Sequence, residues 1–310
     1  MLTPSISAII CTYNRDTYVG AAIDSILAQD LPEFEVILVD NCSTDRTKAI
    51  AQERLSDPRF KYFYESQLGL SAARNRGFKE AKGDILVYLD DDAVASPGWL
   101  RAIYQAYKNN EKLAIAGGKT TLIWPPNTPR PNWLSRDASG VLGLYDLGDA
   151  PLSITRPDRS PIGANYSIRR DILEAIGGFN VNLGRVGKNL VSNEELFMTE
   201  QVLKQGWMVM YLPDAAAGHN VIPERITPNW FLKRSWGQGI SESYRDQLAN
   251  RSALTQFGNG GERLLRGLYK SLKYFGSPEQ RFENFLYAYG QIAYLKTSIR
   301  GMLFGKISAE

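Results

Sequence analysis

The segment Ile85–Asp92 constrains the fold more than any other part of this sequence. Its residues are Ile-Leu-Val-Tyr-Leu-Asp-Asp-Asp, so a short apolar run ends abruptly in three carboxylates. Consecutive apolar residues predict a strand that is covered on both faces, as in a parallel α/β sheet. Ligands of such sheets bind beyond the carboxyl ends of the strands, which is where the aspartates lie. The segment therefore predicts a buried strand that opens onto a site.

Three adjacent carboxylates at a strand end require a source of stabilisation. Two like charges about 4 Å apart repel each other by roughly 4 kcal/mol at the effective dielectric of a protein surface. A bound divalent cation would offset this repulsion. A solvated turn is the alternative, because aspartate is common in turns. Taken alone, the tripeptide fits both interpretations.

Length and charge narrow the class of protein. With 310 residues, 44% of them hydrophobic, the chain is long enough to bury a full core. The net charge of +3 is too small to indicate a nucleic-acid partner. Residues 229–310 contain 12 Lys and Arg against 6 Asp and Glu, whereas the preceding residues contain 24 against 27. A basic C-terminal region fits either an anionic partner or a solvated helix face.

The cysteines and the apolar segments indicate a compartment. Cys11 and Cys42 lack metal-ligand spacing, so we interpret them as reduced packing residues of a cytoplasmic protein. No uncharged apolar stretch reaches the roughly 18 to 20 residues that span a bilayer. The start Met1–Pro4 lacks the basic residues of a signal peptide. We expect a protein that is neither exported by that route nor integral to a membrane.

The first forty residues predict a strand, a helix and a second strand. Ile6–Thr12 and Val36–Val39 are apolar runs, and Val19–Leu27 has helical spacing between them, so the two strands should be parallel. The turn after Thr12 lacks the glycines of a dinucleotide-binding unit, which disfavours a nicotinamide enzyme. Asp40 ends the second strand as Asp90 ends the later one. Two strands should therefore deliver acids to one edge.

The remaining pattern completes an α/β sequence of elements. Ser43 or Thr44 is expected to cap a helix that runs to about Leu55. Residues 120–161 form a long, Pro-rich stretch that predicts an extended loop. The other expected elements are strands at Phe60–Tyr64, Leu113–Ala116, Tyr166–Arg169 and Trp207–Leu212, and helices around Arg74, from Trp99, before Gly177, from Glu194 to Gly206 and from Phe282 to Leu303.

Four motifs occur in a characteristic order. They are Ile-Ile-Cys-Thr-Tyr-Asn-Arg at 9–15, Val-Asp-Asn-Cys-Ser-Thr-Asp at 39–45, Ala-Ala-Arg-Asn-Arg-Gly at 72–77 and Tyr-Leu-Asp-Asp-Asp at 88–92. With later segments they resemble a family 2 glycosyltransferase over residues 5 to about 240. The resemblance implies an inverting enzyme that uses a nucleotide-diphospho-sugar. It also implies a GT-A fold, in which helices flank a Rossmann-like, mostly parallel sheet.

The resemblance also implies a domain organisation. Residues 1–222 would form the catalytic domain, with a nucleotide-sugar half at about 1–118 and an acceptor half at about 119–222. Residues 223–310 would form a C-terminal helical extension.

The resemblance assigns a donor site and a metal site. Asp92 and His219 would hold the metal, Mn²⁺ or Mg²⁺, and the imidazole would suit Mn²⁺ better. A purely structural role is the alternative for His219, the one histidine of the chain. Asp90 would support the metal, and Asp91 would face the ribose. The nucleotide-binding residues would be Thr12, Tyr13, Asn14, Arg15, Asp40, Arg74, Asp90 and Asp91.

The resemblance further assigns a base in the first turn of the helix that begins near Ser192. The family usually has Glu-Asp at this place, so Glu195 matches the base and Glu194 its neighbour. This chain has Glu instead of Asp at the second position, which leaves the choice between the two open. Negative charge at a helix N-terminus is stabilising in any case.

Other segments would contact the acceptor and the diphosphate. Gly163, Ala164 and Asn165 match the acceptor-side strand of the family. Trp124 and Trp133 would stack on acceptor sugars, or would anchor their loop to the core. Arg234 and Trp236 match a basic segment that closes over the diphosphate. The Gln-x-x-Arg-Trp pattern of processive synthases is absent, which favours transfer of one sugar per encounter.

The sequence thus predicts an inverting, metal-dependent glycosyltransferase that moves a sugar, preferably from a UDP-sugar, to a hydroxyl of a saccharide or lipid-linked acceptor. A catalytically silent nucleotide-sugar-binding scaffold is the alternative. A nucleotidyltransferase is disfavoured, because the first strand is not followed by a Gly-rich phosphate loop. The basic, amphipathic segment Phe282–Leu303 would touch the inner face of a membrane, or would pack on the catalytic domain.

Overall fold

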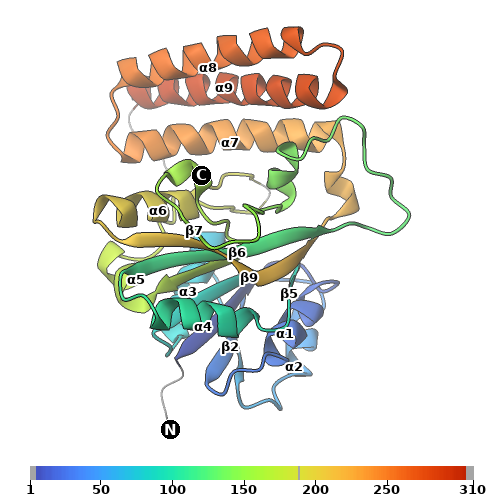
Figure 1. Cartoon of the computed structure of the whole chain (residues 1–310), viewed down its shortest axis with the longest axis vertical. Helices are drawn as coiled ribbons and strands as arrows, with labels where there is room; N and C mark the ends of the chain where they lie inside the picture. The colour runs from blue at the N-terminus through green and yellow to red at the C-terminus, as the bar shows by residue number, and fades with distance from the viewer. Residues whose placement is uncertain (1–4, 188, 305–310) are drawn as a thin grey trace. The chain divides into compact units, whose positions relative to one another are not determined.

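The computed structural model describes residues 5–187 and 189–304 (Figure 1). The expected N-terminus Met1–Pro4 and the last six residues of the expected extension lie outside this range. The chain divides into two compact units. The sheet unit comprises the described residues up to Ile123 with Gly143–Val181 and Glu194–Asn220, and the helical unit comprises Trp124–Leu142, Asn182–Asn193 and the described residues from Val221. The functional boundary at residue 222 stays a prediction.

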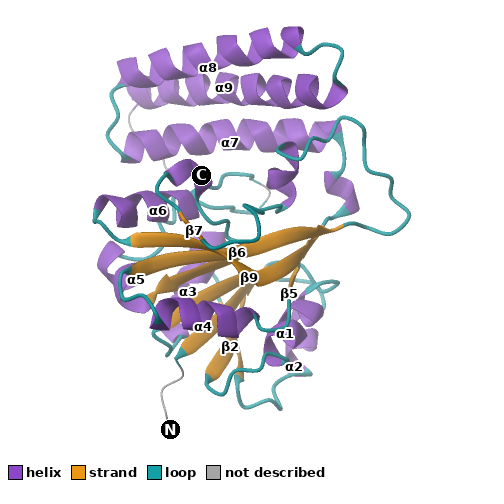
Figure 2. Cartoon of the chain, in the orientation of Figure 1, coloured by secondary structure: helices purple, strands orange, loops and turns teal. Residues whose placement is uncertain are grey.

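The first half of the sheet unit follows the expected strand-helix-strand pattern. Four parallel strands lie in the order β3-β2-β1-β4. Their bounds are β1 (Ile6–Thr12), β2 (Phe34–Asp40), β3 (Phe60–Tyr64) and β4 (Ile85–Asp90), and the helices between them are α1 (Val19–Leu27), α2 (Thr47–Gln52) and α3 (Leu70–Glu80). Alternate residues of β1 enter different cores, with Ile10 packed beside α1 and Ile9 in the cluster that contains Ala73 of α3. Both faces of the sheet are therefore covered (Figure 2).

The second half of the sheet is mixed. Strand β8 (Asn165–Arg169) runs antiparallel to both β4 and β6 (Leu113–Ile123). Strand β9 (Met208–Asn220) is parallel to β6 and antiparallel to two short strands, β5 (Ala93–Ala95) and β7 (Leu152–Ser153). The helices of this half are α4 (Trp99–Lys108), α5 (Arg170–Ile176) and α6 (Glu194–Lys204). The α/β fold with helices flanking a central sheet is confirmed, and its parallel parts are the first four strands and the pair of β6 and β9.

Two strands extend further than the sequence indicates. Strand β6 continues through Gly117 and Gly118 to Ile123, and β9 continues past Leu212 to Asn220. A Cβ on Gly118 would lie 1.7 Å from the carbonyl oxygen of Ala215, so only glycine lets the two strands pass there. The extension of β9 matters for the site, because it includes His219.

The predicted cap of the second helix is wrong. Helix α2 begins at Thr47, whose backbone N–H donates to Asp45 Oδ1 at 3.0 Å. The Ser43 hydroxyl instead accepts a hydrogen bond from the backbone N–H of Asn14. Ser43 and Thr44 thus join two loops, whereas Asp45 binds the first N–H of α2.

The helical unit is built mainly from three long helices, α7 (Pro228–Leu248), α8 (Ala253–Lys273) and α9 (Pro278–Phe304). Helix α9 packs on both α7 and α8 (Figure 1). Thr227 and Ser252 cap α7 and α8 by accepting hydrogen bonds from Trp230 and Thr255. Within the described residues, no helix has the length and apolar character that are needed to cross a membrane.

Candidate active site

The carboxyl ends of three parallel strands meet at one edge of the sheet. In the strand register Thr12 pairs with Asp40, and Cys11 pairs with Asp90. The prediction that two strands deliver acids to one edge is therefore confirmed. Burial raises the pKa of the Cys11 thiol to about 12, so this cysteine stays protonated, as expected of a packing residue.

A group of potential metal ligands lies at this edge. Ligand atoms of Asp90, Asp92 and His219 all lie within 4.8 Å of one another. His219 Nε2 is 3.0 Å from Asp92 Oδ1 and 3.9 Å from Asp90 Oδ2. The two predicted ligands, Asp92 and His219, are thus brought together, and Asp90 joins them as a third. Two carboxylates and an imidazole are suitable donors for a divalent transition metal, so this set fits the implied ion.

Pairing between β5 and β9 brings these residues together across the sequence. Ala93 pairs with His219, so Asp92 lies next to Asn220. The backbone N–H and the side-chain amide of Asn220 both donate to the carbonyl oxygen of Asp92, at 2.8 and 3.1 Å. Gly143 borders the imidazole, because a Cβ at that position would lie 2.8 Å from His219 Cγ and Nδ1. Asn220 and Gly143 therefore orient the site, although neither is a sequence-predicted site residue.

Asp91 lies between Asp90 and Asp92 in the sequence and has a distinct environment. Burial, followed by the charge of Asp92, raises the pKa of Asp91 to about 7, and Arg15 acts in the opposite direction. The Arg15 guanidinium reaches to 3.9 Å from the Asp91 carboxylate. The three adjacent carboxylates therefore concentrate negative charge at this strand end.

The loops after β1 and β2 are joined by hydrogen bonds. Asn14 has a positive φ of 53° and accepts hydrogen bonds from the N–H and hydroxyl of Thr44. The buried Asp40 carboxylate accepts from the Ser43 N–H and from the Tyr62 hydroxyl, at 2.9 and 2.8 Å. These contacts fix the Asp40 side chain at the strand end. Its role in binding a base stays a prediction, as do those of Thr12 and the half-exposed Tyr13.

Asn41 positions the loop that precedes α3, and the sequence motifs did not single it out as a site residue. Its amide donates to the carbonyl oxygens of Glu65 and Gln67, and its oxygen accepts from the N–H of Gly69. The buried side chain thus ties the loop before α3 to the end of β2. An asparagine directly after an apolar strand was the available signal.

Arg74 is buried in a triad of charges with the two candidate bases. Its Nη1 atom lies 2.8 Å from Glu194 Oε1 and 2.8 Å from Glu195 Oε1. Burial opposes the charged form of Arg74, but the carboxylates of Glu195, Glu194 and Asp90 outweigh it and raise the pKa of the guanidinium. The predicted contact of Arg74 with base or diphosphate stays a prediction, because here its guanidinium pairs with the glutamates.

Gly163 and Ala164 lie between the two charged groups. A Cβ on Gly163 would lie 1.9 Å from Glu195 Oε1 and 2.1 Å from Arg74 Nη2. The carbonyl oxygen of the next residue, Ala164, accepts a hydrogen bond from the backbone N–H of Asp90 at 3.3 Å. One dipeptide therefore touches both the acidic strand end and the glutamate pair.

The Asn165 side chain makes hydrogen bonds within the sheet unit. Its side chain is almost fully buried and accepts from the Trp99 indole N–H at 2.9 Å. Its amide group donates to the carbonyl oxygens of Ala215 and Lys119, at 2.8 and 3.3 Å. An acceptor contact by Asn165 stays a prediction that these bonds do not favour.

Four predicted site residues belong to the helical unit, namely Trp124, Trp133, Arg234 and Trp236. The contacts described below for them lie within that unit. Trp133 packs edge-on against Phe231 and Phe282, with ring centroids 5.2 and 4.9 Å away, which matches the anchoring alternative. The Trp124 indole donates to the carbonyl oxygen of Thr128. Trp236 packs on Tyr289 of α9, at 5.2 Å between ring centroids.

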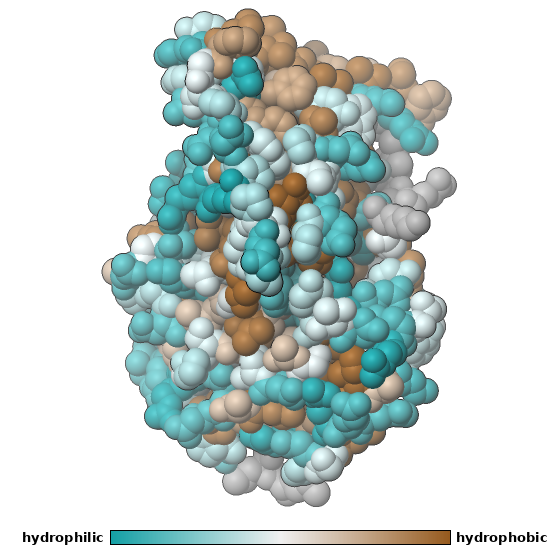
Figure 3. Space-filling model, turned by 90° about the vertical axis from the view of Figure 1, so that its right-hand side faces the viewer, coloured by the Kyte–Doolittle hydropathy of each residue, from teal (hydrophilic) through white to brown (hydrophobic). Residues whose placement is uncertain are grey.

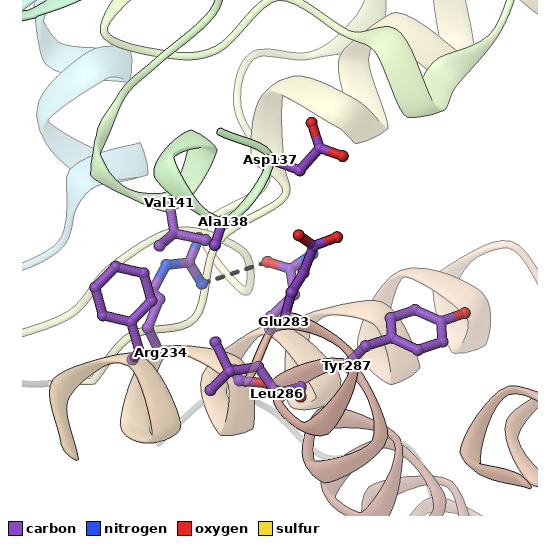
Figure 4. A pocket seen from close by; sticks show the side chains of 10 residues that line it. Asp137, Ala138, Val141, Arg234, Glu283, Leu286 and Tyr287 are labelled. Atoms are coloured by element: carbon purple, nitrogen blue, oxygen red, sulfur yellow. Dashed lines mark hydrogen bonds between the residues drawn. The ribbon is translucent and has the colours of Figure 1, made fainter. Parts of the chain in front are cut away.

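Arg234 lines a cavity of about 190 Å³ inside the helical unit (Figure 4). Its guanidinium donates to the Leu190 carbonyl oxygen, the Ser192 hydroxyl and the Gln238 side chain, at 3.2, 3.1 and 3.3 Å. Asp137 and Glu283 also line this cavity. A diphosphate contact by Arg234 or Trp236 stays a prediction.

Comparison with known proteins identifies the family. The sequence model of Glycosyl transferase family 2 matches residues 7–177, more than half of the chain. The chain belongs to this family. The match includes the acidic strand end and the Gly163–Ala164 dipeptide, and it confirms the sequence-predicted resemblance. The protein is therefore a glycosyltransferase.

Individual relatives of this family 2 member differ in how much of the chain they cover. The glucosyl-dolichyl phosphate glucuronosyltransferase of Haloferax volcanii is 26% identical over 247 residues, which are 78% of each chain. The GalNAc(5)-diNAcBac-PP-undecaprenol beta-1,3-glucosyltransferase of Campylobacter jejuni is 36% identical over 140 residues, covering 44% of this chain and 43% of that protein.

A solved structure supports the fold of the family 2 chain. It is a mannosyltransferase from Pyrobaculum calidifontis in complex with GDP-Man and Mn²⁺. It matches with a TM-score of 0.59 at 19% identity, covering 99% of this chain and 78% of the other. The predicted GT-A fold is thereby confirmed.

Proposed function

We propose that this family 2 member is an inverting, metal-dependent glycosyltransferase whose base is Glu195. The observation that carries the proposal is the Gly163–Ala164 dipeptide, which borders Glu195 on one side and hydrogen-bonds Asp90 on the other. A group suited to a metal and a carboxylate suited to proton transfer thus flank the same short segment. A single displacement needs these two groups on opposite sides of the reacting sugar.

The proposed reaction is one in-line step. Glu195 takes the proton of an acceptor hydroxyl, and the acceptor oxygen forms a bond to the anomeric carbon. The bond from that carbon to the diphosphate oxygen breaks, and the nucleoside diphosphate leaves with the electron pair. The configuration at the anomeric carbon inverts, because one displacement takes place.

The chain's own residues would bind and orient the reactants. Asp90, Asp92 and His219 would hold the divalent metal, which when bound neutralises charge on the departing diphosphate. Asn220 and Gly143 would keep Asp92 and the imidazole in place. Thr12, Tyr13, Asn14, Arg15, Asp40 and Asp91 would line the nucleotide site.

Burial favours Glu195 over Glu194 as the base. The Glu194 side chain is 3% exposed and the Glu195 side chain is 14% exposed, while both contact the same Arg74 nitrogen. An acceptor hydroxyl has to reach the base, so the more accessible carboxylate suits proton transfer. The role of Glu194 would be to balance the charge of the buried Arg74.

The proposed donor is a nucleoside-diphosphate sugar, with UDP-sugars first and GDP-sugars second. The proposed acceptor is a hydroxyl of a lipid-linked saccharide, in polysaccharide or glycolipid synthesis. Two relatives whose names contain dolichyl phosphate and undecaprenol support this choice. Such an acceptor would require work at a membrane, which we propose to be its cytoplasmic face, reached through the C-terminal helices.

The test combines binding and chemistry. The purified chain is titrated with UDP- and GDP-sugars in the presence of Mn²⁺, of Mg²⁺ or of a chelator, and thermal stabilisation is recorded. We expect stabilisation that requires the metal, together with release of nucleoside diphosphate and a product of inverted configuration by NMR. Binding without any nucleotide release would reject the enzyme in favour of a scaffold, and a retained configuration would reject the single displacement.

A further inference from the structure

The outer face of α8 is apolar to a degree that is unusual for a helix in water. Leu254, Leu265 and Leu272 are 86%, 69% and 74% exposed. Figure 3 shows hydrophobic residues gathered over α8 and α9. We define the α8 face as the exposed apolar residues of α8 and of the turn that follows it, which are Leu254, Leu265, Leu268, Tyr269, Leu272 and Phe275.

These residues form one stripe instead of a scatter. Leu254, Leu265, Leu268 and Leu272 are separated by eleven, three and four positions, so they lie along one side of α8. A helix in a water-soluble protein turns such a stripe toward the core. In α8 the buried residues are instead Gln256, Gly260 and Gly267.

Several of the contacts between α7, α8 and α9 are made by small residues. A Cβ on Gly267 would lie 2.9 Å from Ala288 Cβ, and a Cβ on Gly239 would lie 2.0 Å from the Gly290 carbonyl oxygen. The helices therefore approach one another through residues without side chains. Close packing of this kind is the usual way in which helices associate in lipid, where burial of apolar surface offers no gain.

Hydrogen bonds between side chains complete this interior. The Ser243 and Ser298 hydroxyls lie 2.9 Å apart, and the Tyr294 hydroxyl donates to Asp246 at 2.7 Å. Both pairs join α7 to α9 and are buried. Polar contacts thus join these helices, while the leucines of the α8 face are exposed.

Positive charge lies beside the α8 face. Arg266, Lys270 and Lys273 are exposed on the same helix, against one exposed acid, Glu262. Helix α8 has four basic residues among its 21 residues, so it does not suit a membrane-spanning segment. A helix with a leucine stripe and flanking basic residues is suited to lie flat in an interface that contains anionic lipid.

We propose that the α8 face inserts into the interfacial layer of a lipid bilayer that contains anionic lipid. Its leucines enter the acyl boundary, and Arg266, Lys270 and Lys273 contact phosphate groups at the surface. This inference deepens the membrane contact of the proposed function by assigning it to α8, whereas the sequence pattern pointed to α9. It does not require that the proposed transfer reaction be correct.

The test uses the full chain and two sets of sedimented vesicles, phosphatidylcholine alone and phosphatidylcholine with phosphatidylglycerol. We expect the unmodified chain to sediment with the anionic vesicles. The double variant Leu265→Glu/Leu272→Glu should lose more than about tenfold in partitioning, because two inserted leucines become charged. Lys270→Glu/Lys273→Glu should remove the preference for anionic vesicles.

Matched variants separate this proposal from its alternatives. Leu55→Glu changes an exposed leucine of the sheet unit and should bind vesicles like the unmodified chain. Ile292→Glu/Ile299→Glu changes exposed residues of α9, and a larger loss there than in the α8 variant would overturn the assignment to α8. Melting temperatures should agree among all variants, because each changed side chain is exposed.

Two further outcomes would overturn the proposal. One is failure of the unmodified chain to bind anionic vesicles. The other is a dimer in light scattering that the α8 variant converts to a monomer, since the face would then join two copies of the chain. Transfer to a soluble acceptor is measured in parallel. If the unmodified chain transfers no sugar, the proposed function is rejected. The vesicle result still decides the role of α8.

Discussion

Two clusters of charged side chains in the sheet unit differ in where their counter-charge originates. The triad of Arg74, Glu194 and Glu195 contains its own cation, with two contacts of 2.8 Å. The acid cluster brings Asp90, Asp91 and Asp92 together beside one imidazole, and Arg15 approaches only to 3.9 Å. In the first cluster one guanidinium contacts both carboxylates, whereas the second places three adjacent carboxylates beside an imidazole, an arrangement that a bound cation would stabilise. We interpret the first as a positioned base and the second as a donor and metal site.

Changing the proposed base should have the largest effect. Glu195→Gln keeps the size of the side chain but removes its capacity to accept a proton, so turnover should fall by about 10² to 10⁴-fold. Donor affinity, measured by calorimetry with Mn²⁺, should stay unchanged.

The matched variant is Glu194→Gln, which should mainly lower the melting temperature, because Glu194 is the more buried partner of Arg74. A stable Glu194→Gln enzyme with the larger loss of turnover would move the base by one residue.

Removing one carboxylate from the acid cluster should weaken the metal-dependent binding of nucleotide. In Asp92→Asn one anionic ligand is lost, and Mn²⁺-dependent nucleotide affinity should fall by more than about 100-fold, beyond the usual effect of an outer-shell partner. The melting temperature without metal should not fall, because repulsion among the carboxylates is relieved. Asp149→Asn, at an exposed acid of the same unit, is the control. Equal metal-dependent affinity in both variants would contradict the metal assignment.

A methyl group at Gly163 should disturb the triad of Arg74, Glu194 and Glu195. In Gly163→Ala the new Cβ would overlap Glu195 Oε1 and Arg74 Nη2, so both side chains must move. A displacement of about 1 Å can cost 10²-fold, and we expect turnover to fall by about 10 to 100-fold with little change in donor affinity. Ala164→Gly at the neighbouring buried position serves as the control. If the two variants have equal turnover, Glu195 tolerates displacement and is not the base.

The smallest effect should come from the contact behind the imidazole. In Gly143→Ala the Cβ would meet the His219 ring at 2.8 Å, so Mn²⁺ affinity should fall by about tenfold. Both Gly143 and Gly148 have positive φ angles, 103° and 112°, but a Cβ on Gly148 meets nothing within 4 Å. Gly148→Ala therefore reproduces the backbone strain without the contact. A similar loss in both variants would attribute the effect to strain and remove His219 from the argument.

The sequence predicted the strands in the first half of the sheet well, because their signals are local. Apolar runs such as Ile6–Thr12 and Ile85–Leu89 are strands in the structure, and the acids that follow them lie at one edge as expected. The pairing of His219 with Ala93 was not predictable in this way, because it depends on a strand that continues through Pro213 and Gly218. The position of Gly143 beside the imidazole depends on a loop whose path no periodicity records.

For the helical unit the sequence predicted a helical C-terminal extension and one individual helix, but neither α7 and α8 as separate helices nor the packing. The spacing from Phe282 to Leu303 predicted a helix, which is α9. The direction of its apolar residues could not be inferred, since periodicity reveals a stripe without revealing what covers it. The alternative for Trp133, an anchor in place of a stacking platform, matches the aromatic contacts that the structure records.

The glycine contacts between helices of the helical unit affect how this protein can diverge. At Gly239 the atom nearest to an added Cβ is a backbone oxygen of α9, 2.0 Å away, and no rotamer change can relieve such an overlap. Outward positions such as Leu254 face no comparable barrier. Over evolutionary time we therefore expect substitutions to accumulate on the outside of these helices while the glycines between them persist, so that relatives would share the spacing of the bundle more closely than its surface.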